Sequence, residues 1–384
     1  MKVYLKYRNY KPIHANFQEL AENPPVGVEY VIEPVNKNIN LFYYIYRRFG
    51  KLSVTRKLYA LLKPFLFNGN KDNLREYDLV HIIDHIPQGY ETYKYVVDLG
   101  HVNALLGYYS LTEKNARQVI EFLAHPNCKA VLARSIAAKK SIANNLKDFC
   151  NHTELAEITD KTDVVYPATK LYGDKHRHKS KYLRLLLVGN GIYNKGIHEA
   201  IEAYLQVKKV HPNITFTVVA SDYEELDSKY LNSGVKFHGG GLSRKEAIAE
   251  FFSSHDVFIL PTHHEIFGMV FLDAFSTAMP AIAINQYSTS EIIKDGVNGF
   301  LVNSKKVPFN EYINLDKKDV KISKFVHPED QVVEELVERI KFFCENPSEI
   351  QRLGKNAQRL VTSGKFSIKT RNTQLKHIYE KAIR

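Results

Sequence analysis

Short apolar runs bounded by polar residues recur along the first half of the chain, as expected of strands buried on both faces of a parallel sheet. Stretches with helical periodicity separate some of these runs, at 17–21 and 137–146. The alternation predicts an α/β layer structure with crossover helices. The predicted strands of this half are 2–7, 28–32, 77–84, 93–101, 128–135 and 162–168.

The same alternation restarts after a polar, basic stretch and forms a second complete series. Helices are predicted at 197–210 and 243–253 between the new strands. A doubly wound sheet in each half predicts two Rossmann-like domains that face each other across a cleft, where α/β sheets bind ligands at the carboxyl ends of their strands. The predicted strands of this half are 183–190, 214–221, 235–240, 256–261, 280–285 and 300–303.

The chain length supports this division, since 384 residues exceed the usual size of a single hydrophobic core. Residues 171–181 lack an apolar period and are strongly basic, which predicts a linker. We therefore place an N-terminal domain at 1–170 and a C-terminal domain at 182–366, with 367–384 as a further segment.

Composition is that of an ordinary globular protein, with 44% apolar and 25% charged residues. No window approaches the ~18 apolar residues of a membrane helix, and the first ten residues lack a signal-peptide core, so we expect a cytoplasmic protein. Three scattered cysteines predict neither a disulfide framework nor a zinc site. The net charge of +11 would attract nucleic acid, anionic lipid or a polyanionic substrate, and a lysine-rich proteome would explain it equally well.

Residues 41–67, LFYYIYRRFGKLSVTRKLYALLKPFLF, mix aromatic and basic side chains. This composition suits an interfacial helix against anionic lipid. The alternative is an ordinary amphipathic helix pair whose basic side chains extend into water. Peripheral contact with the cytoplasmic face of a membrane is therefore one prediction for this segment.

The stretch HHEIFGMVFLDA, residues 263–274, carries the candidate chemistry. Glu265 follows a predicted strand, and Gly268 opens a helix whose free amides, at Phe267, Gly268 and Met269, form a natural anion site. Asp273 lies some 7 to 8 Å further along the helix, at ~1.5 Å per residue. Two carboxylates on either side of a phosphate site match a nucleotide sugar, with hydroxyls at both ends of a diphosphate. The alternative is a buried helix with a capping glutamate and one satisfied aspartate.

A second segment, VGNGIYNKG at 188–196, places Lys195 after a strand that ends at Gly189. Lysine binds phosphate as a point charge, so Lys195 is a candidate diphosphate contact. The spacing matches neither the dinucleotide-binding fingerprint nor the P-loop.

The run from 235 to 302, together with LLLVGNGIYNKGIHEAIEAY at 185–204, resembles the donor domain of retaining glycosyltransferases of family four, which have the GT-B fold. The resemblance implies an enzyme of the hexosyltransferase type that transfers sugar with retention and without a metal. Its co-substrate would be a nucleotide-diphosphate sugar, and no other cofactor is implied. The last helix, about 368–383, resembles the family segment that returns to the first domain.

The family's residue roles can be carried over by position. Glu265 would hold the hydroxyls of the transferred sugar, Asp273 would bind ribose, and Lys195 would neutralise the diphosphate beside the amides of the helix start. Gly189 and Asn190 match the phosphate-arm segment of the donor site. His101, after a strand in the first half, matches a histidine that projects into the cleft from the acceptor domain.

The chain departs from the family pattern at several of these positions. Asn190 stands where arginine is usual, and Asp273 replaces a glutamate. Ala278 replaces a common glycine, residues 287–289 replace a glycine-rich turn, and the stretch KYRNYKPIHAN at 6–16 lacks the usual N-terminal glycine loop. A protein that binds nucleotide sugars with weakened catalysis is therefore an alternative to an active enzyme.

The acceptor is left open by the sequence. Saccharide, lipid-linked, other glycoconjugate and protein acceptors all fit the predicted chemistry. A nucleic-acid-binding protein is a third possibility on charge alone, but the sequence contains no recognised nucleic-acid-binding motif, so no specific nucleic acid is expected as a partner.

Overall fold

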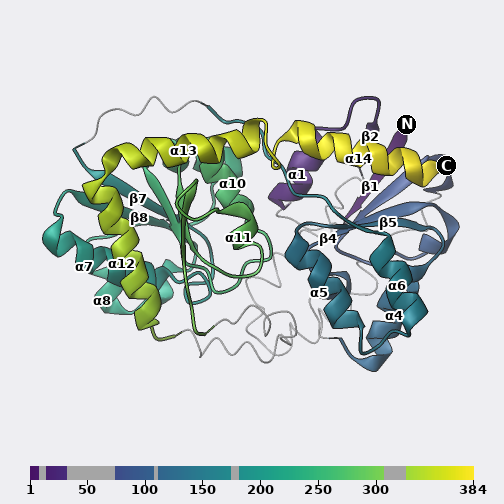
Figure 1. The fold of residues 1–384 in the computed structure, drawn as a ribbon, viewed down its shortest axis with the longest axis horizontal. Helices are drawn as coiled ribbons and strands as arrows, with labels where there is room; N and C mark the ends of the chain where they lie inside the picture. Colours follow the sequence, from purple (N-terminus) through teal and green to yellow (C-terminus); the bar gives the residue numbers. More distant parts are fainter. Residues whose placement is uncertain (8–13, 33–73, 108–110, 174–180, 307–325) are drawn as a thin grey trace. The chain divides into compact units, whose positions relative to one another are not determined.

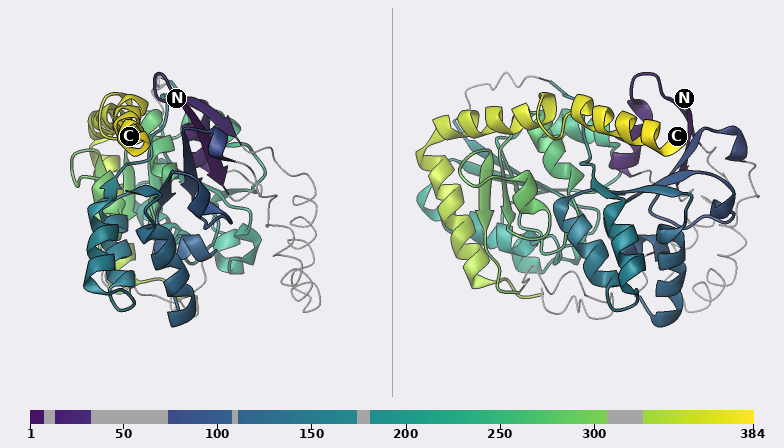
Figure 2. Two further views of the ribbon diagram at one scale, coloured as in Figure 1. Left: turned by 90° about the vertical axis from the view of Figure 1, so that its right-hand side faces the viewer. Right: turned by 45° about the vertical axis from the view of Figure 1, so that its right-hand side comes forward.

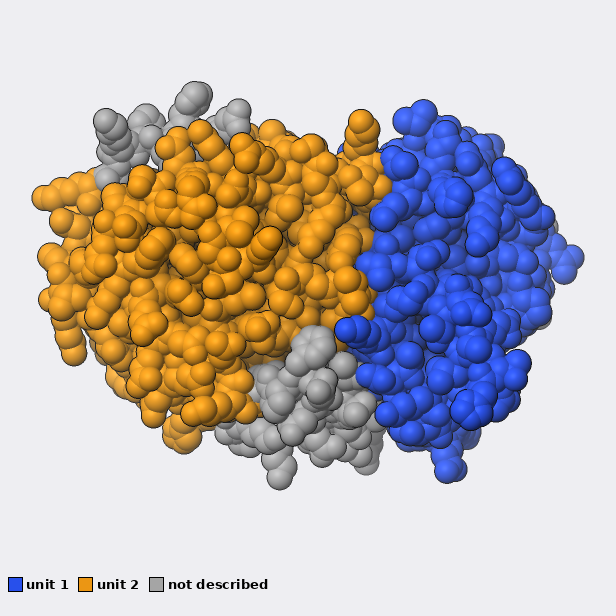
Figure 3. Space-filling view, viewed as in Figure 1, with its two compact units in different colours: residues 1–134, 139–165, 372–384 blue, residues 135–138, 166–371 orange. Residues whose placement is uncertain are grey.

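The computed structural model describes residues 1–384 except 8–13, 33–73, 108–110, 174–180 and 307–325. The described chain forms two compact units, shown in blue and orange in Figure 3. Unit 1 comprises Met1–Arg134, Lys139–Val165 and Asn372–Arg384, and unit 2 comprises Ser135–Ala138 and Tyr166–Arg371. The segment 41–67, for which membrane contact is predicted, lies outside the described residues, as does most of the predicted linker.

Unit 1 is built on a six-stranded sheet in which every strand pair is parallel. The strand order is β2-β1-β3-β4-β5-β6, so the order reverses between β1 and β3. β3 is apolar apart from one histidine and buried throughout, as expected of an inner strand of a parallel sheet. The strands are β1 (Lys2–Tyr7), β2 (Glu29–Ile32), β3 (Leu79–Ile83), β4 (Tyr95–Leu99), β5 (Cys128–Ala133) and β6 (Thr162–Val164).

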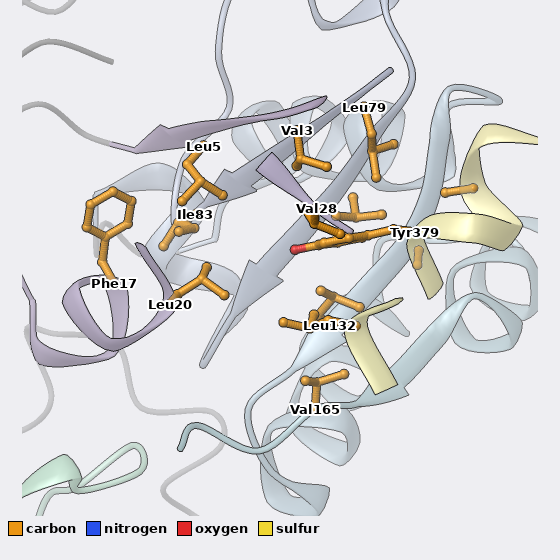
Figure 4. Close-up of a cluster of buried hydrophobic side chains, with 14 of the residues drawn as sticks. Val3, Leu5, Phe17, Leu20, Val28, Leu79, Ile83, Leu132, Val165 and Tyr379 are labelled. Atoms are coloured by element: carbon orange, nitrogen blue, oxygen red, sulfur yellow. The ribbon is translucent and has the colours of Figure 1, made fainter. Parts of the chain in front are cut away.

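Helices from both ends of the chain pack on this sheet. The last helix contributes Tyr379, which is fully buried in the same apolar cluster as Val3 and Leu5 (Figure 4). The Tyr379 hydroxyl lies 2.6 Å from His81 Nδ1 and 2.9 Å from the hydroxyl of Tyr30, so this buried polar group is satisfied. The helices are α1 (Ala15–Glu22), α4 (Glu113–Ala124), α5 (Ile136–Leu146), α6 (His152–Asp160) and α14 (Ile368–Ile383), of which α5 and α14 begin in unit 2; short 3-10 turns are η1 (Leu74–Glu76), η2 (Tyr90–Thr92) and η3 (Val102–Leu106).

Unit 2 contains a second six-stranded parallel sheet, in the order β12-β11-β10-β7-β8-β9. Its first strand in the chain, β7, is paired with β8 on one side and with β10 on the other. The strand order therefore reverses between β7 and β10, which is the topological switch point where doubly wound sheets bind ligands. The strands are β7 (Leu183–Val188), β8 (Ile214–Val219), β9 (Lys236–His238), β10 (Val257–Leu260), β11 (Ala281–Ile284) and β12 (Gly299–Val302).

The helices of unit 2 cover this sheet, with α12 packed on α7 and α13 packed on α10 (Figures 1 and 2). The predicted helix at 243–253 is divided, because α9 continues into a single π-helical turn at Ile248–Phe252. None of the helices in the described part of the chain is both long and apolar enough to cross a membrane. The helices are α7 (Ile197–Val210), α8 (Ser228–Leu231), α9 (Arg244–Ala247), α10 (Met269–Ser276), α11 (Thr289–Ile292), α12 (Asp330–Glu345) and α13 (Pro347–Thr362), with a 3-10 turn η4 at Tyr223–Glu225.

The predicted fold class is confirmed as two α/β units, each with a Rossmann-like doubly wound sheet. Each predicted strand is present, and all lie within the range that the hydrophobic pattern gave except β12, which begins one residue earlier, at Gly299. The change from unit 1 to unit 2 falls between Val165 and Tyr166, just before the predicted domain end at residue 170.

Candidate functional site

Lys195 and Glu265 meet at the switch point of the unit 2 sheet. Lys195 follows β7 and Glu265 follows β10, the two strands between which the order reverses. Lys195 Nζ lies 2.6 Å from Glu265 Oε2, and the two side chains are 19% and 18% exposed. The structure thus brings together two residues that are seventy positions apart in the chain and that the sequence predicts for one site.

The backbone around Lys195 approaches the end of β10 closely. Gly196 has a φ of 63°, and a Cβ at this position would lie 2.3 Å from the carbonyl oxygen of Pro261. His263 N donates to the carbonyl of Asn194 at 2.8 Å, and Thr262 Oγ1 donates to the same carbonyl at 3.2 Å. Only glycine fits at 196, because both the left-handed backbone and the contact exclude a side chain.

The start of α10 lies immediately after Glu265. Gly268 is the N-cap, with a φ of 88°, and a Cβ there would meet the Phe271 ring at 2.6 Å. Ser288 Oγ donates to the carbonyls of Ile266 and Phe267, at 2.8 and 3.2 Å. These two hydrogen bonds therefore hold the loop between β10 and α10 in place. Because no side chain caps α10, the amides predicted for an anion, at 267–269, stand at an uncapped helix N-terminus.

Asp273 lies in α10 and is 6% exposed, and it forms an ion pair with Arg244. Arg244 Nε lies 2.9 Å from Asp273 Oδ1, and Arg244 Nη2 contacts the same oxygen. Arg244 Nη2 also donates to Thr169 Oγ1 at 2.8 Å, and the guanidinium carbon lies 5.6 Å from the centroid of the Tyr172 ring. The carboxylate that the sequence assigns to ribose is thus held by an arginine from α9.

Asn190 bridges the ends of β7 and β8. Its Oδ1 accepts from Ser221 N at 2.8 Å and from Ser221 Oγ at 2.9 Å. Gly189 is covered by the neighbouring cation, because a Cβ at Gly189 would lie 3.4 Å from Lys195 Cγ. The Asn190 side chain thus accepts two hydrogen bonds at the carboxyl ends of β7 and β8, which an arginine could not do because its side chain has no acceptor.

His101 belongs to unit 1, whereas the other predicted site residues belong to unit 2. It follows β4 and is the N-cap of the turn η3, where its Nδ1 accepts from Asn103 N at 3.2 Å. The ring is half-buried. Its predicted role toward the acceptor stays a prediction.

Arg244 and Ser288 were not identified from the sequence. Arg244 follows the N-cap Ser243, whose side chain forms a capping box with Glu246. The S-x-x-E signature could have located this helix start, but it carries no information on the direction of the arginine. Ser288 stands in the segment 287–289, which the sequence marks only as a departure from a glycine-rich turn.

The arrangement combines a cation and helix amides with a carboxylate that can accept hydrogen bonds from hydroxyl groups. Lysine and the start of α10 can neutralise an anion, and Glu265 can accept hydrogen bonds from sugar hydroxyls. Within the described ranges, no group of three or more His, Cys, Asp or Glu side chains is placed to hold a metal ion.

Comparison with known protein families gives a match at this unit. Residues 170–319 match the family model of glycosyl transferases group 1. Glycogen synthase of Mycobacterium tuberculosis is 30% identical over 153 residues, which is 38% of this chain and 36% of that protein. The capsular polysaccharide biosynthesis glycosyltransferase CapM of Staphylococcus aureus is 27% identical over 146 residues, 34% of this chain and 37% of that protein. The chain thus spans less than half the length of these relatives.

Solved structures resemble the whole described fold. The Anabaena protein HepE, crystallised in complex with UDP, superposes with a TM-score of 0.63 at 16% identity, covering 99% of this chain and all of that one. A glycosyltransferase from Rickettsia africae gives a TM-score of 0.62 at 14% identity, covering 100% of this chain and 98% of that chain. At these identities the likeness shows a shared fold, the GT-B architecture of two Rossmann-like domains.

Proposed function

We propose that this chain, whose residues 170–319 match the family model of glycosyl transferases group 1, transfers a hexose from a nucleotide-diphosphate sugar to a glycan acceptor with retention at the anomeric carbon. The relatives support the reaction class, since their names describe glycosyl transfer and capsular polysaccharide biosynthesis. UDP is the first nucleotide to test, because HepE was crystallised with it.

The contact that carries this proposal is the 2.6 Å pair of Lys195 and Glu265 at the switch point. A diphosphate at this place meets a cation and the start of α10, and the attached sugar meets a carboxylate. Both side chains are mostly buried, so their charges act in surroundings less polar than water. Donor binding would exchange the contact between Lys195 and Glu265 for contacts with diphosphate and sugar.

The chemistry requires no group beyond these residues. The bond between the anomeric carbon and the diphosphate oxygen breaks, and a bond from the acceptor oxygen to the anomeric carbon forms on the same face. The acceptor hydroxyl proton passes to the departing diphosphate. Lys195 and the helix amides stabilise the charge that develops on that diphosphate, and this electrostatic contribution lowers the barrier. The proposed reaction is metal-independent for the same reason.

The acceptor is proposed as a saccharide, a lipid-linked saccharide or another glycoconjugate. CapM supports a polysaccharide product, since its name places it in capsule biosynthesis. We propose that the protein acts at the cytoplasmic face of a membrane. That location rests on the basic aromatic segment 41–67.

The test compares the wild-type protein with the Lys195→Ala and Glu265→Gln variants on UDP-, GDP- and other nucleotide sugars. Release of nucleoside diphosphate and the anomeric configuration of the product are measured. Each variant should lower kcat by about 10²- to 10³-fold, as loss of one electrostatic contact does elsewhere. A wild-type protein that binds a nucleotide sugar without any turnover would instead support the nucleotide-sugar-binding alternative.

A further inference from the structure

We infer that the buried pair of His263 and Glu199 positions the donor site by fixing the backbone on which Lys195 and Glu265 stand. The inference rests on the proposed function for the meaning of the site, and it adds two residues that would touch neither donor nor acceptor. His263 and Glu199 are each 0% exposed, so a ligand does not reach them.

The pair joins the two segments that form the site. Glu199 lies in the first turn of α7, and His263 follows β10. His263 Nε2 is 2.9 Å from both Glu199 Oε1 and Oε2. Because a carboxylate only accepts, the proton of this contact is on Nε2, which donates to Glu199.

The His263–Glu199 contact joins the same two segments as the contact between Lys195 and Glu265. Lys195 is four residues before Glu199, and Glu265 is two residues after His263. The backbone bond from His263 N to the Asn194 carbonyl, at 2.8 Å, connects the same segments between the two side-chain pairs. The site is thus joined by two pairs: Lys195 with Glu265, which are partly exposed and are called the accessible pair below, and His263 with Glu199, the fully buried enclosed pair.

The Glu199 carboxyl group has further partners besides His263. Glu329 N donates to Glu199 Oε1 at 3.1 Å, and the start of α7 places its positive end beside the carboxylate. A Cβ on Gly196 would lie 2.7 Å from Glu199 Oε2, so the carboxylate also fills the space beside residues 189–196, the lysine loop that carries Lys195. A buried carboxylate needs such partners, and removal of the imidazole donor would force the segment to rearrange.

The neighbouring His198 shows that a histidine can be fully buried here without a hydrogen bond from its ring to a carboxylate of the described residues. His198 is also 0% exposed, and burial lowers the pKa of its ring, against the opposing effect of Glu199. His263 by contrast points its Nε2 at the carboxylate.

The enclosed pair becomes most important when the accessible pair separates. On donor binding, Lys195 would turn to the diphosphate and Glu265 to the sugar, so their mutual contact would no longer join the segments. The His263–Glu199 pair would then keep the side chains of Lys195 and Glu265 at the separation that the bound donor requires. Its loss should therefore reduce kcat more than it raises KM for the donor.

The kinetic test uses His263→Leu, His263→Gln and a control, His255→Gln. Glutamine retains an N–H donor near the Nε2 position. His255 contacts Thr217 Oγ1 at 2.8 Å elsewhere in unit 2, so its replacement controls for the loss of a bonded histidine. His263→Leu should lower kcat by about 30-fold, within the range that ~1 Å of misplacement causes, while His263→Gln loses no more than about threefold.

A second readout needs no turnover. Acylation of lysines by an amine-reactive ester is followed residue by residue with mass spectrometry, with Lys229 as internal reference because it pairs with Glu202 at 2.9 Å in the same unit. His263→Leu should raise labelling of Lys195 about fivefold relative to Lys229, and Glu199→Gln about twofold, because weaker pairing exposes the amine. His255→Gln should change neither lysine.

The two proposals fail separately in this design. If the wild-type protein transfers no sugar, the proposed function fails, and the labelling of Lys195 still decides the positioning role. A folded His263→Leu variant with wild-type labelling and wild-type kcat would overturn the inference. If that variant does not fold, Glu199→Gln decides, since wild-type labelling in that isosteric variant contradicts the role.

Discussion

Arg244 and Asp273 form an ion pair in which the arginine side chain is 14% exposed and the aspartate side chain 8%. The pair connects α9 to α10 inside unit 2. It explains how a carboxylate is accommodated in the apolar stretch from Met269 to Ser276, because the guanidinium of Arg244 carries the opposite charge.

Removal of one partner should therefore destabilise the protein. Asp273→Ala leaves a largely buried arginine without its carboxylate, and we expect a loss of about 3 kcal/mol in the free energy of unfolding. Urea denaturation measures this loss. The double replacement Arg244→Leu with Asp273→Leu is the control, and it should recover much of the stability; a double variant as unstable as Asp273→Ala would contradict the assignment.

The same pair allows the predicted ribose contact to be tested. Asp273→Asn keeps the shape of the side chain, and it should weaken UDP binding about tenfold if the carboxylate accepts from ribose hydroxyls, at about 1.4 kcal/mol per tenfold change. Inorganic pyrophosphate lacks ribose, so its affinity should be unchanged. Calorimetry with both ligands makes the comparison, and an equal loss for both would place Asp273 outside the ribose site.

Asn190 offers a test of the phosphate end of the site. Asn190→Asp keeps the acceptor for Ser221 N and Oγ, so its stability should stay near that of the wild type. The added negative charge should lower UDP affinity about tenfold at low salt if the side chain lies beside the diphosphate. Asn190→Leu is the converse control, since it loses both hydrogen bonds and about 1 to 2 kcal/mol of stability without adding charge. Unchanged UDP binding by the aspartate variant would show that Asn190 does not face the donor.

Ala278 departs from the resemblance at a position where the backbone favours glycine. Its φ is 55°, in the left-handed region, and Tyr287 in the other departing segment has a φ of 41°. Ala278→Gly should stabilise the fold by up to about 1 kcal/mol, since glycine removes the strain of a left-handed alanine. Ala274→Gly, within α10, should instead destabilise by about 1 kcal/mol or more. Thermal unfolding of the two variants should shift in opposite directions, and a destabilised Ala278→Gly would contradict the strain.

The sequence predicted the strands well because inner parallel strands are apolar along their whole length. β10 and β11 are buried at every residue, and the pattern of their side chains marks them without ambiguity. The π-helical turn at Ile248–Phe252 left no comparable signal, since its buried residues Ile248, Phe251 and Phe252 have the i, i+3, i+4 spacing of an α-helix. Helix type at this point depends on packing rather than on periodicity.

The candidate site was predictable only in part, for a related reason. Lys195 and Glu265 each follow a predicted strand, and the general strand order of doubly wound sheets brings such ends together. The contact between Arg244 and Asp273 instead depends on the direction of a long side chain across 29 residues of sequence. The pair of His263 and Glu199 likewise required coordinates, because a buried histidine and a first-turn glutamate each have common structural explanations.

Gly196 should be the most sensitive glycine of the lysine loop, and Gly191 is its matched control. Both have positive φ, 63° and 94°, but a Cβ at Gly196 would lie 2.3 Å from Pro261 O, whereas at Gly191 the nearest atom would be Asn194 Cβ at 3.9 Å. Gly191→Ala therefore costs only backbone strain, about 1 to 2 kcal/mol.

Gly196→Ala adds a steric conflict with the backbone after β10, so we expect a loss of about 3 kcal/mol or more in unfolding free energy together with weaker UDP binding. The binding loss follows because relief of the conflict with Pro261 would move the segment of Lys195 away from the segment of Glu265. Urea denaturation and calorimetry on both variants give the comparison. Equal losses of stability in the two variants would mean that the close approach of Gly196 to Pro261 does not constrain the loop. The position of Lys195 would then not depend on that approach.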